Sequence, residues 1–462
     1  MTNEPGDRPD DEQPNPFKGT PFEQIFNAFG GLGGAGGGFP GMPGGQGGAG
    51  MPDLSALMSQ MQAMMSPHEG SVNWALAKDV ARRTVAEQPD PSPTARQASE
   101  IADALRLADH WLDSSTEFAS GVSSSAAWSR AEWVEQTIDV WKVLVEPVAE
   151  HVVSAMGGAL PPEAQQMAGP LMGLLGQAGG AMFGSQVGQA LGGLAGEVLS
   201  ASDIGLPLGP GGKAALLPVN VAAFADGLDV GQDDVLLYLA LREAAHQRLF
   251  AHVPWLRGHL VAAVEDYGRG TTIDMSKIES SMRDIDPTNP ASIQEALDGG
   301  LFEPEKSPAQ QAALTRLETA LALVEGWVDE VVGQATETRM PAAAKMQEAV
   351  RRRRAAGGPA ESTFAALVGL ELRPRRLRDA SALWGSLRSR KGQDARDAVW
   401  SHPDLLPTSA DLDDPLGFQE GSVPASQALS DDDFDAALAE LLDNEADEDG
   451  DTDGTGGGQP TP

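Results

Sequence analysis

The sequence of 462 residues contains no cysteine. This absence excludes structural disulfides, and it also excludes every zinc site, iron–sulfur cluster and nucleophile that depends on a thiol. Any metal ion bound by this chain must therefore be held by histidine, aspartate or glutamate side chains.

Basic residues are scarce, because 32 Lys and Arg stand against 67 Asp and Glu and give a formal net charge of −35. An excess of negative charge of this size repels nucleic-acid phosphates and anionic lipid. The first seven residues are acidic and are not followed by an apolar run, so the sequence does not predict a secretory signal. We expect a cytoplasmic protein with no transmembrane span and no nucleic-acid partner.

Composition divides the chain into three parts. Residues 1–70 are rich in glycine, methionine and proline, and such a segment buries too little apolar surface to offset ~1–2 kcal/mol per residue of backbone ordering. Residues 421–462 include twelve acids and no base from Leu429 onward. We predict disordered arms at both ends of a folded domain at residues 71–420. The short apolar patches in the arms suit either docking to an unknown protein partner or no specific role.

Apolar residues between positions 71 and 420 recur mostly at the spacing of amphipathic helices. One stripe consists of Ile101, Leu105, Ala108 and Leu112. A second helix is expected to begin near the serines at 123–125, which suit an N-terminal cap, and to bury Trp128, Trp133, Trp141 and Val145. Another helix spans 308–339, and residues 215–221 suit a short strand. The predicted fold class is mainly α, with many helices and at most a few short strands.

An uncharged run extends from Ala164 to Gly196, and glycine occupies every fourth position within it: Gly176, Gly180, Gly184, Gly188, Gly192 and Gly196. One face of a helix would then be bare backbone, which lets a second helix approach closely. Strongly apolar residues are sparse in this run and several glutamines interrupt it. A helix packed in a protein core is therefore favoured over a membrane span.

Residues 339–397 reverse the overall charge, because fourteen bases against six acids give a local charge of +8. A basic cluster near tryptophan is one feature of nucleic-acid-binding proteins. Solvated helix faces, or docking of the chain's own acidic tail, explain the same cluster. No nucleic-acid-binding motif accompanies the charge, so the latter explanations are favoured.

The stretch Arg242-Glu243-Ala244-Ala245-His246 matches the helix of zinc peptidases at all positions except the first. That helix carries two histidines four residues apart, which hold zinc from one side, and a glutamate that activates the zinc-bound water. Glu243 and His246 occupy the positions of the base and of the second ligand. Arg242 occupies the position of the first ligand, and a guanidinium has no lone pair to offer a metal.

Other side chains are candidates for the missing ligand. His252 follows His246 by six residues and Glu265 follows it by nineteen, intervals that resemble those of two different classes of zinc peptidase. If zinc is bound, we predict Glu243 as the catalytic base and His246, His252 and Glu265 as metal ligands. The further donors nearby are His259 and Asp266. A Glu-x-x-His pair on a helix also occurs without metal, as ordinary pairing between neighbouring turns.

Three stretches of the chain resemble a single protein family: Gly184–Gly192, Trp255–Leu260 and Thr363–Arg378. It is the family of zincin-like hydrolases of high-GC Gram-positive bacteria, which carry the label of zinc-dependent metalloproteases. The resemblance covers residues 71–420 and implies a zincin-like core, a peptide or protein substrate and zinc. Some relatives carry a complete His-Glu-x-x-His at this helix, and on that pattern Glu243 would be the base and His246 the second ligand.

Two hypotheses of function follow. In the first, the protein is a zincin-like metallohydrolase of the peptidase type, with a motif made degenerate by Arg242. In the second, it is a non-enzymatic intracellular interaction or scaffold protein whose arms dock protein partners.

Overall fold

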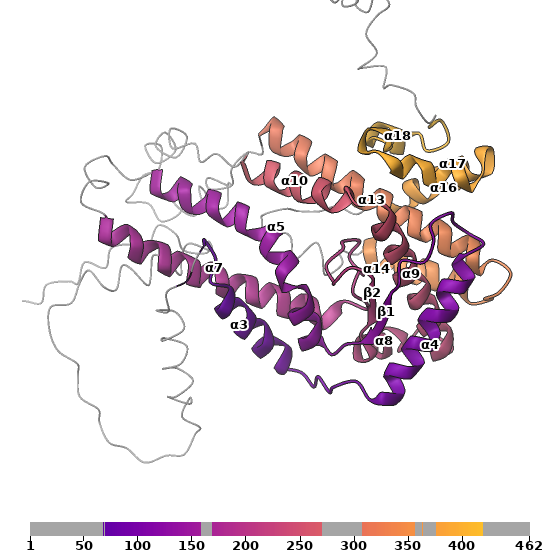
Figure 1. Cartoon of the computed structure of the whole chain (residues 1–462), viewed down its shortest axis with the longest axis horizontal. Helices are drawn as coiled ribbons and strands as arrows, with labels where there is room; N and C mark the ends of the chain where they lie inside the picture. Colours follow the sequence, from indigo (N-terminus) through magenta and orange to yellow (C-terminus); the bar gives the residue numbers. More distant parts are fainter. Residues whose placement is uncertain are drawn as a thin grey trace, which may run out of the picture. The chain divides into compact units, whose positions relative to one another are not determined.

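The computed structural model describes residue 68 and residues 70–158, 169–269, 307–355, 363 and 376–418. These residues form twelve α-helices and two short strands (Figure 1), so the prediction of a mainly α fold is confirmed. All of these elements lie in one compact unit, residues 1–416, and residues 417–462 make up a second unit. Except for residues 68 and 70, the predicted arms lie outside the described residues.

Helix α4 (Ala95–Leu112) shows how local sequence sets the helix boundaries. It begins after Thr94, whose side chain accepts a hydrogen bond from the backbone amide of Gln97, while the Gln97 side chain accepts one from the Thr94 amide. This reciprocal cap satisfies two amides that would otherwise lack partners. The residues that α4 buries are the predicted stripe: Ile101, Leu105, Ala108 and Leu112.

Helix α7 (Gly169–Glu197) packs against α3 (Trp74–Ala86) along the glycine repeat. A Cβ atom added at Gly184 would lie 2.4 Å from the carbonyl oxygen of Asn73, and one added at Gly188 would lie 2.5 Å from that of Ala77. The bare backbone therefore allows the two helices to touch, as the sequence predicts for a helix in a protein core. No helix in the described ranges combines the length and hydropathy needed to cross a membrane.

The glycine contact leads to a prediction with an internal control. We expect Gly188→Ala to lower the free energy of unfolding by about 1–3 kcal/mol, because the added methyl overpacks the contact with α3. Gly193 lies on the same helix and has no atom within 4 Å of an added Cβ. There, Gly193→Ala should stabilise the protein by up to about 1 kcal/mol through helix propensity. Urea denaturation of both variants measures the difference, and equal effects would contradict the close contact.

Strands β1 (Ser124–Ala127) and β2 (Lys213–Leu216) pair in parallel. The predicted helix cap at residues 123–125 is therefore wrong, because the Ser123 amide and hydroxyl both donate to the Gly212 carbonyl and hold this segment extended. Helix α5 (Arg130–Gly158) begins later and is capped by Ser129, whose hydroxyl accepts from the Glu132 amide at 3.1 Å. The strand expected at 215–221 ends at Leu216. Helix α8 (Pro218–Ala225) begins two residues later, because proline favours the first turn of a helix.

The remaining elements follow in the second half of the described chain. They are α9 (Gln232–His252), α10 (Leu256–Arg269), α13 (Pro308–Thr336), α14 (Ala343–Ala355), α16 (Leu377–Lys391), α17 (Gln393–Ala398), two short 3-10 helices (Val399–Ser401 and Pro403–Leu405) and α18 (Ser409–Asp413). Helix α9 contacts α4, α8, α13, α14 and β2, and α13 contacts α10, α14 and α16 as well (Figure 1). The two helices α9 and α13 therefore form the centre of this unit.

Candidate functional site

Helix α9 carries Arg242, Glu243 and His246, and protein surrounds the central part of this helix on every side. Every residue from Tyr238 to Leu249 is buried. The exposed fractions of Arg242, Glu243 and His246 are 5%, 0% and 1%. Burying a charged group is costly unless it is paired and hydrogen-bonded. The partners of these three side chains therefore define the site.

The imidazole of His246 lies between two acceptor oxygens. Its Nδ1 is 2.9 Å from the carbonyl oxygen of Arg242, one turn earlier on α9, and its Nε2 is 3.1 Å from Oε1 of Glu325 on α13. A neutral imidazole can donate from one nitrogen only. Both contacts are hydrogen bonds only when the ring is doubly protonated, and in that form it has no lone pair for a metal.

Glu325 is the acceptor shared by the cations of the site. The Nη2 atom of Arg242 lies 2.5 Å from Oε2, and Nη2 of Arg354 on α14 lies 2.9 Å from Oε1. Burial acts to raise the pKa of Glu325, but the charges of Arg354 and Arg242 and the hydrogen bond with His246 outweigh it and hold the pKa far below the ordinary value. The side chain is therefore a carboxylate at neutral pH.

The Glu243 carboxylate is bound by groups of the protein itself. It accepts hydrogen bonds from the Ser202 amide at 3.1 Å, from Gln247 Nε2 at 3.0 Å and from the Ala215 amide of β2 at 3.4 Å. Burial raises the pKa of Glu243, and these donors counteract that effect only in part. The side chain thus connects α9 to β2 and to the segment that precedes it.

The structure does not bring the other predicted ligands to His246. The ring of His252 stacks on Phe118 at 5.1 Å, and Glu265 pairs with Arg269 at 3.4 Å on α10. The further donors also have other neighbours: His259 meets Trp255 edge-on, and Asp266 pairs with Arg269 and Arg316. Within the described ranges, no three or more His, Asp or Glu side chains are grouped so that they could hold a metal.

Sequence reasoning missed Glu325, the residue on which the site converges. It lies 79 residues after His246 in the chain, so no short motif connects the two. One signal was available, because Glu325 interrupts the apolar face of the predicted helix at 308–339, between Val324 and Trp327. A charged residue on a buried stripe marks a partner elsewhere in the fold.

A second set of contacts lies one helical turn away. Asp329 follows Glu325 by one turn on α13, and its Oδ2 accepts from Arg351 Nη2 of α14 at 2.5 Å and from the hydroxyl of Ser381 at 2.8 Å. Tyr238 precedes Arg242 by one turn on α9. We refer to the following set as the α9–α13–α14 cluster: Tyr238, Arg242, Glu325, Asp329, Arg351 and Arg354.

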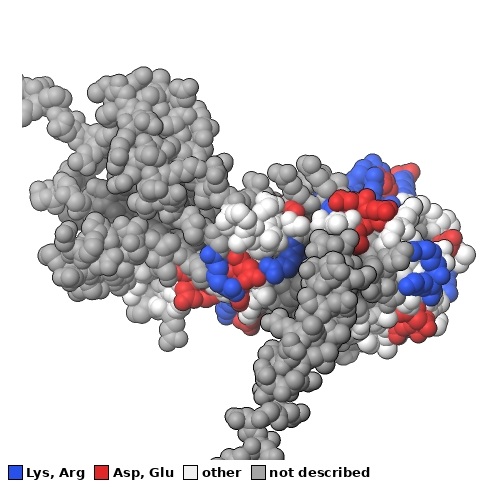
Figure 2. Space-filling view, turned by 90° about the horizontal axis from the view of Figure 1, so that it is seen from above, with Lys and Arg blue, Asp and Glu red and all other residues white. Residues whose placement is uncertain are grey.

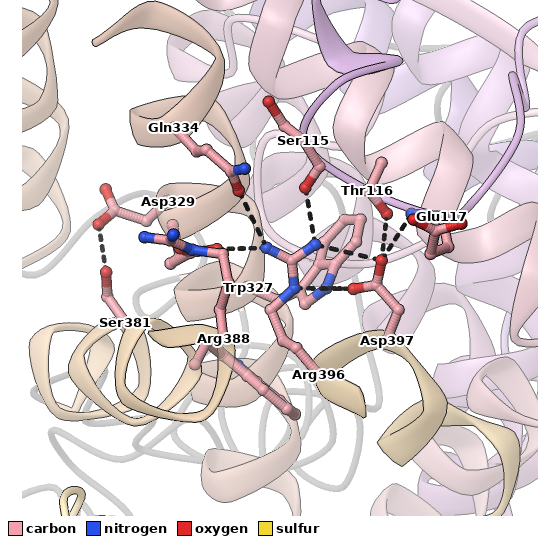
Figure 3. A network of polar contacts seen from close by, with 12 residues as sticks. Ser115, Thr116, Glu117, Trp327, Asp329, Gln334, Ser381, Arg388, Arg396 and Asp397 are labelled. Carbon is pink, nitrogen blue, oxygen red and sulfur yellow. Dashed lines mark hydrogen bonds and ion pairs between the residues drawn. The ribbon is translucent and has the colours of Figure 1, made fainter. Parts of the chain in front are cut away.

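A separate buried network joins α17 to α13 (Figure 3). Arg396 is fully buried, and it pairs with Glu330 at 2.5 Å and donates to the Ser115 carbonyl at 2.7 Å. Asp397 accepts from the Trp327 ring nitrogen at 2.9 Å and from Thr116 at 2.6 Å. These contacts fix the C-terminal helices on α13 and use charge for internal packing.

The basic residues of 339–397 that the structure describes also contact other groups of the protein. Each has an internal hydrogen bond, ion pair or electrostatic partner: Arg339, Lys345, Arg351, Arg352, Arg353, Arg354, Arg376, Arg378, Arg388, Arg390, Lys391 and Arg396. Figure 2 shows acidic and basic side chains next to one another on the face in view. Contacts within the protein, most of them ion pairs, therefore engage the basic residues of this stretch that the structure describes.

The lowered pKa of Glu325 gives a prediction about acid stability. A carboxyl whose folded pKa is depressed stabilises the fold above its unfolded value, here 4.5, and that contribution is lost as pH falls below it. We expect the urea midpoint to fall steeply below pH 4.5, and the fall to be shallower in Glu325→Gln, which has no such carboxyl. Parallel pH profiles for the two proteins would contradict this assignment.

Glu243 and His246 thus lie on one helix with the spacing of the zinc-peptidase motif, and a carboxylate from a second helix contacts His246. The chain belongs to the family of zincin-like metallopeptidases, whose model matches residues 72–418. The chain is also similar to the crystal structure of "a putative hydrolase with a novel fold" from Chloroflexus aurantiacus, with 20% identity and a TM-score of 0.53 over 74% of this chain and 96% of the other. At this identity the likeness concerns the fold. A comparison with curated proteins finds no match.

Proposed function

We propose that this chain is a non-catalytic member of the zincin-like family, in which ion pairs replace the metal centre and the core serves as a scaffold for protein interactions. The observation that carries the proposal is the contact of Arg242 with Glu325. The residue at the position of the first metal ligand is a cation, and it is bound to the carboxylate that meets His246.

The donor set does not fit zinc. A zinc site of this type needs three protein donors at about 2.0–2.2 Å from the ion and an open fourth position. Here the nitrogen and oxygen donors that meet are His246 and Glu325, and both oxygens of Glu325 already accept from guanidinium groups. A metal ion would have to displace Arg242 and Arg354 from the Glu325 oxygens.

The surroundings of Glu243 also favour a structural role. A general base must lie within hydrogen-bond reach of the proton that it removes. The carboxylate of Glu243 is fully buried and bound by backbone amides and by Gln247. This side chain stabilises the contact between α9 and β2.

A zinc analysis separates this proposal from the alternative, a zinc-dependent peptidase that uses Glu243 as base and His246, His252 and Glu265 as ligands. We expect full-length protein prepared without chelator to contain far less than one zinc per chain, and we expect chelator to leave its thermal midpoint unchanged. Stoichiometric zinc that is lost in His246→Ala would overturn the proposal. His110→Ala, which removes an exposed imidazole on α4, serves as the matched comparison for that loss.

The scaffold part of the proposal rests on the two arms, which lie outside the described residues. Their glycine-rich and acidic sequences suit docking to proteins in the cytoplasm. Removing residues 1–70 and 429–462 should abolish capture of the partners that the full chain retains in a crosslinked pull-down. Identical partner sets from the full and shortened chains, both shown to be helical by circular dichroism, would count against docking by the arms.

A further inference from the structure

Strand β1 lies at an edge of the two-stranded sheet and pairs with β2 on one side. The amides of Ser124 and Trp128 donate to carbonyls in or directly before β2, so every second residue from Ser124 onward points its backbone groups toward β2. The residues between them, Ser125 and Ala127, therefore point their amides and carbonyls away from β2. These four groups have no hydrogen-bond partner among the described residues, and Ser125 is exposed.

This edge lacks the features that usually keep a second strand away. Natural edge strands are protected by charged residues, by proline or by a bulge. Strand β1 reads Ser-Ser-Ala-Ala, and its residues pair one to one with those of β2, so it contains none of the three. Its small side chains also leave the backbone accessible. The edge therefore suits β-strand addition, in which an extended peptide makes main-chain hydrogen bonds with a sheet.

The free edge is separate from the polar site on α9. Glu243 accepts a hydrogen bond from the Ala215 amide, which points away from β1 on the other side of β2. Both strands of the sheet thus lie between Glu243 and the outward groups of Ser125 and Ala127. The edge is a surface of its own and not a part of the α9 site.

Charge indicates what kind of strand this edge accepts. The chain has a formal net charge of −35, so a second copy of it is repelled, whereas a segment of a basic protein is attracted. Strand β1 itself has no charged residue. The centre of the added segment should therefore be uncharged, with basic residues on either side of it.

We propose that the outer edge of β1 docks an extended segment of a basic partner protein by β-strand addition. The inference deepens the scaffold part of the proposed function and rests on it. Main-chain hydrogen bonds to Ser125 and Ala127 alone hold a short strand weakly. The edge therefore adds to docking by the arms, as linked binding segments strengthen one another, and does not replace it.

The probe is a synthetic peptide of five alternating valine and threonine residues between two pairs of lysines. We expect it to bind full-length protein at one site per chain, measured by the anisotropy of a fluorescent label at low salt. Methylation of its central backbone amides should weaken binding at least about tenfold, because each lost main-chain hydrogen bond changes affinity by roughly two- to tenfold. Glutamates in place of the lysines should also weaken it. Equal binding of the methylated and unmethylated peptides would overturn the proposal.

Two proline variants of neighbouring alanines locate the edge. Ala127→Pro removes an outward amide, so it should weaken peptide binding by about tenfold and leave the thermal midpoint close to that of the unaltered protein. Ala126→Pro removes an amide that faces β2, so it should lower the thermal midpoint. An equal fall of the midpoint in both variants would show that the edge is not free. Unchanged peptide affinity in Ala127→Pro would equally overturn the assignment.

Two further measurements distinguish this inference from other outcomes. Light scattering should show that full-length protein is a monomer, and a dimer that Ala127→Pro dissociates would overturn the choice of a basic partner in favour of a second copy. Mass spectrometry should find the bound peptide intact. A cleaved peptide would overturn the non-catalytic assignment, but the edge would still stand if methylation of the peptide weakened its binding.

Discussion

The Arg242→His variant should bind one zinc ion per chain, at least about 100-fold more tightly than the unaltered protein, since losing even an outer-shell partner of a metal changes its affinity 10- to 100-fold. The exchange removes the guanidinium that holds Oε2 of Glu325 and places an imidazole one turn before His246. His246 then meets a carboxylate and a second imidazole, which completes three nitrogen and oxygen donors. Competition with a chromophoric chelator measures the affinity.

Two further variants test whether the gain comes from this site. Arg257→His adds an imidazole at an exposed position of α10 and should bind no zinc. Arg242→His combined with Glu325→Gln should lose the zinc that the single variant gains. A folded Arg242→His protein that binds no zinc would show that Arg242 is not what separates this site from a metal centre. Binding should also strengthen as pH rises, because histidine binds a metal only in its deprotonated form.

Periodicity predicts the helices well because their causes are local. The stripe from Ile101 to Leu112 and the cap at Thr94 lie within the same eighteen-residue helix and its N-cap, so the sequence contains all that determines α4. The spacing of Glu243 and His246 likewise identifies α9. Each of these predictions depends on neighbours within a turn or two of helix.

The parts that sequence reasoning missed depend on distant partners. The serines at 123–125 suit a helix cap, but Gly212 binds Ser123 across the fold and draws the segment into β1. Arg242 and Glu325 are 83 positions apart, so the intervals of known zinc motifs pointed to His252 and Glu265 instead. Arginines of α14 meet acids of α13, and composition alone gave only their summed charge.

On the proposal that no metal is bound, the ion pairs of the cluster are what stabilises the buried zincin-like helix. In the metal-bound pattern a cation holds a carboxylate and imidazoles together. Here, guanidinium groups from α9 and α14 supply the positive charge and hold the same kind of carboxylate. Buried ion pairs add little net stability, but they fix which partners meet, because leaving any one of them unpaired is costly. The network therefore sets the register of α9, α13 and α14.

We expect Glu325→Gln to lower the free energy of unfolding by about 3–5 kcal/mol, because removing one partner leaves the others buried without a counter-charge. The groups left are Arg242, Arg354 and the His246 ring. Urea denaturation at neutral pH measures the loss. The matched control is Glu348→Gln, whose carboxylate pairs on the surface and should contribute at most about 1 kcal/mol. Equal losses at the two positions would contradict the burial of charge at Glu325.

A triple exchange distinguishes charge from packing as the cause of that loss. Arg242→Met, Glu325→Leu and Arg354→Met together remove the ion pairs but keep similar volumes, and replacing a buried ion triad in this way is often neutral or stabilising by about 1–4 kcal/mol. Asp203 retains its ion pair with Arg353, and the His246 ring keeps its contact with the backbone carbonyl of residue 242. The triple variant should therefore be more stable than Glu325→Gln by several kcal/mol, although it contains two more substitutions. If it is less stable, the cluster holds the helices by its shape and not by its charge balance.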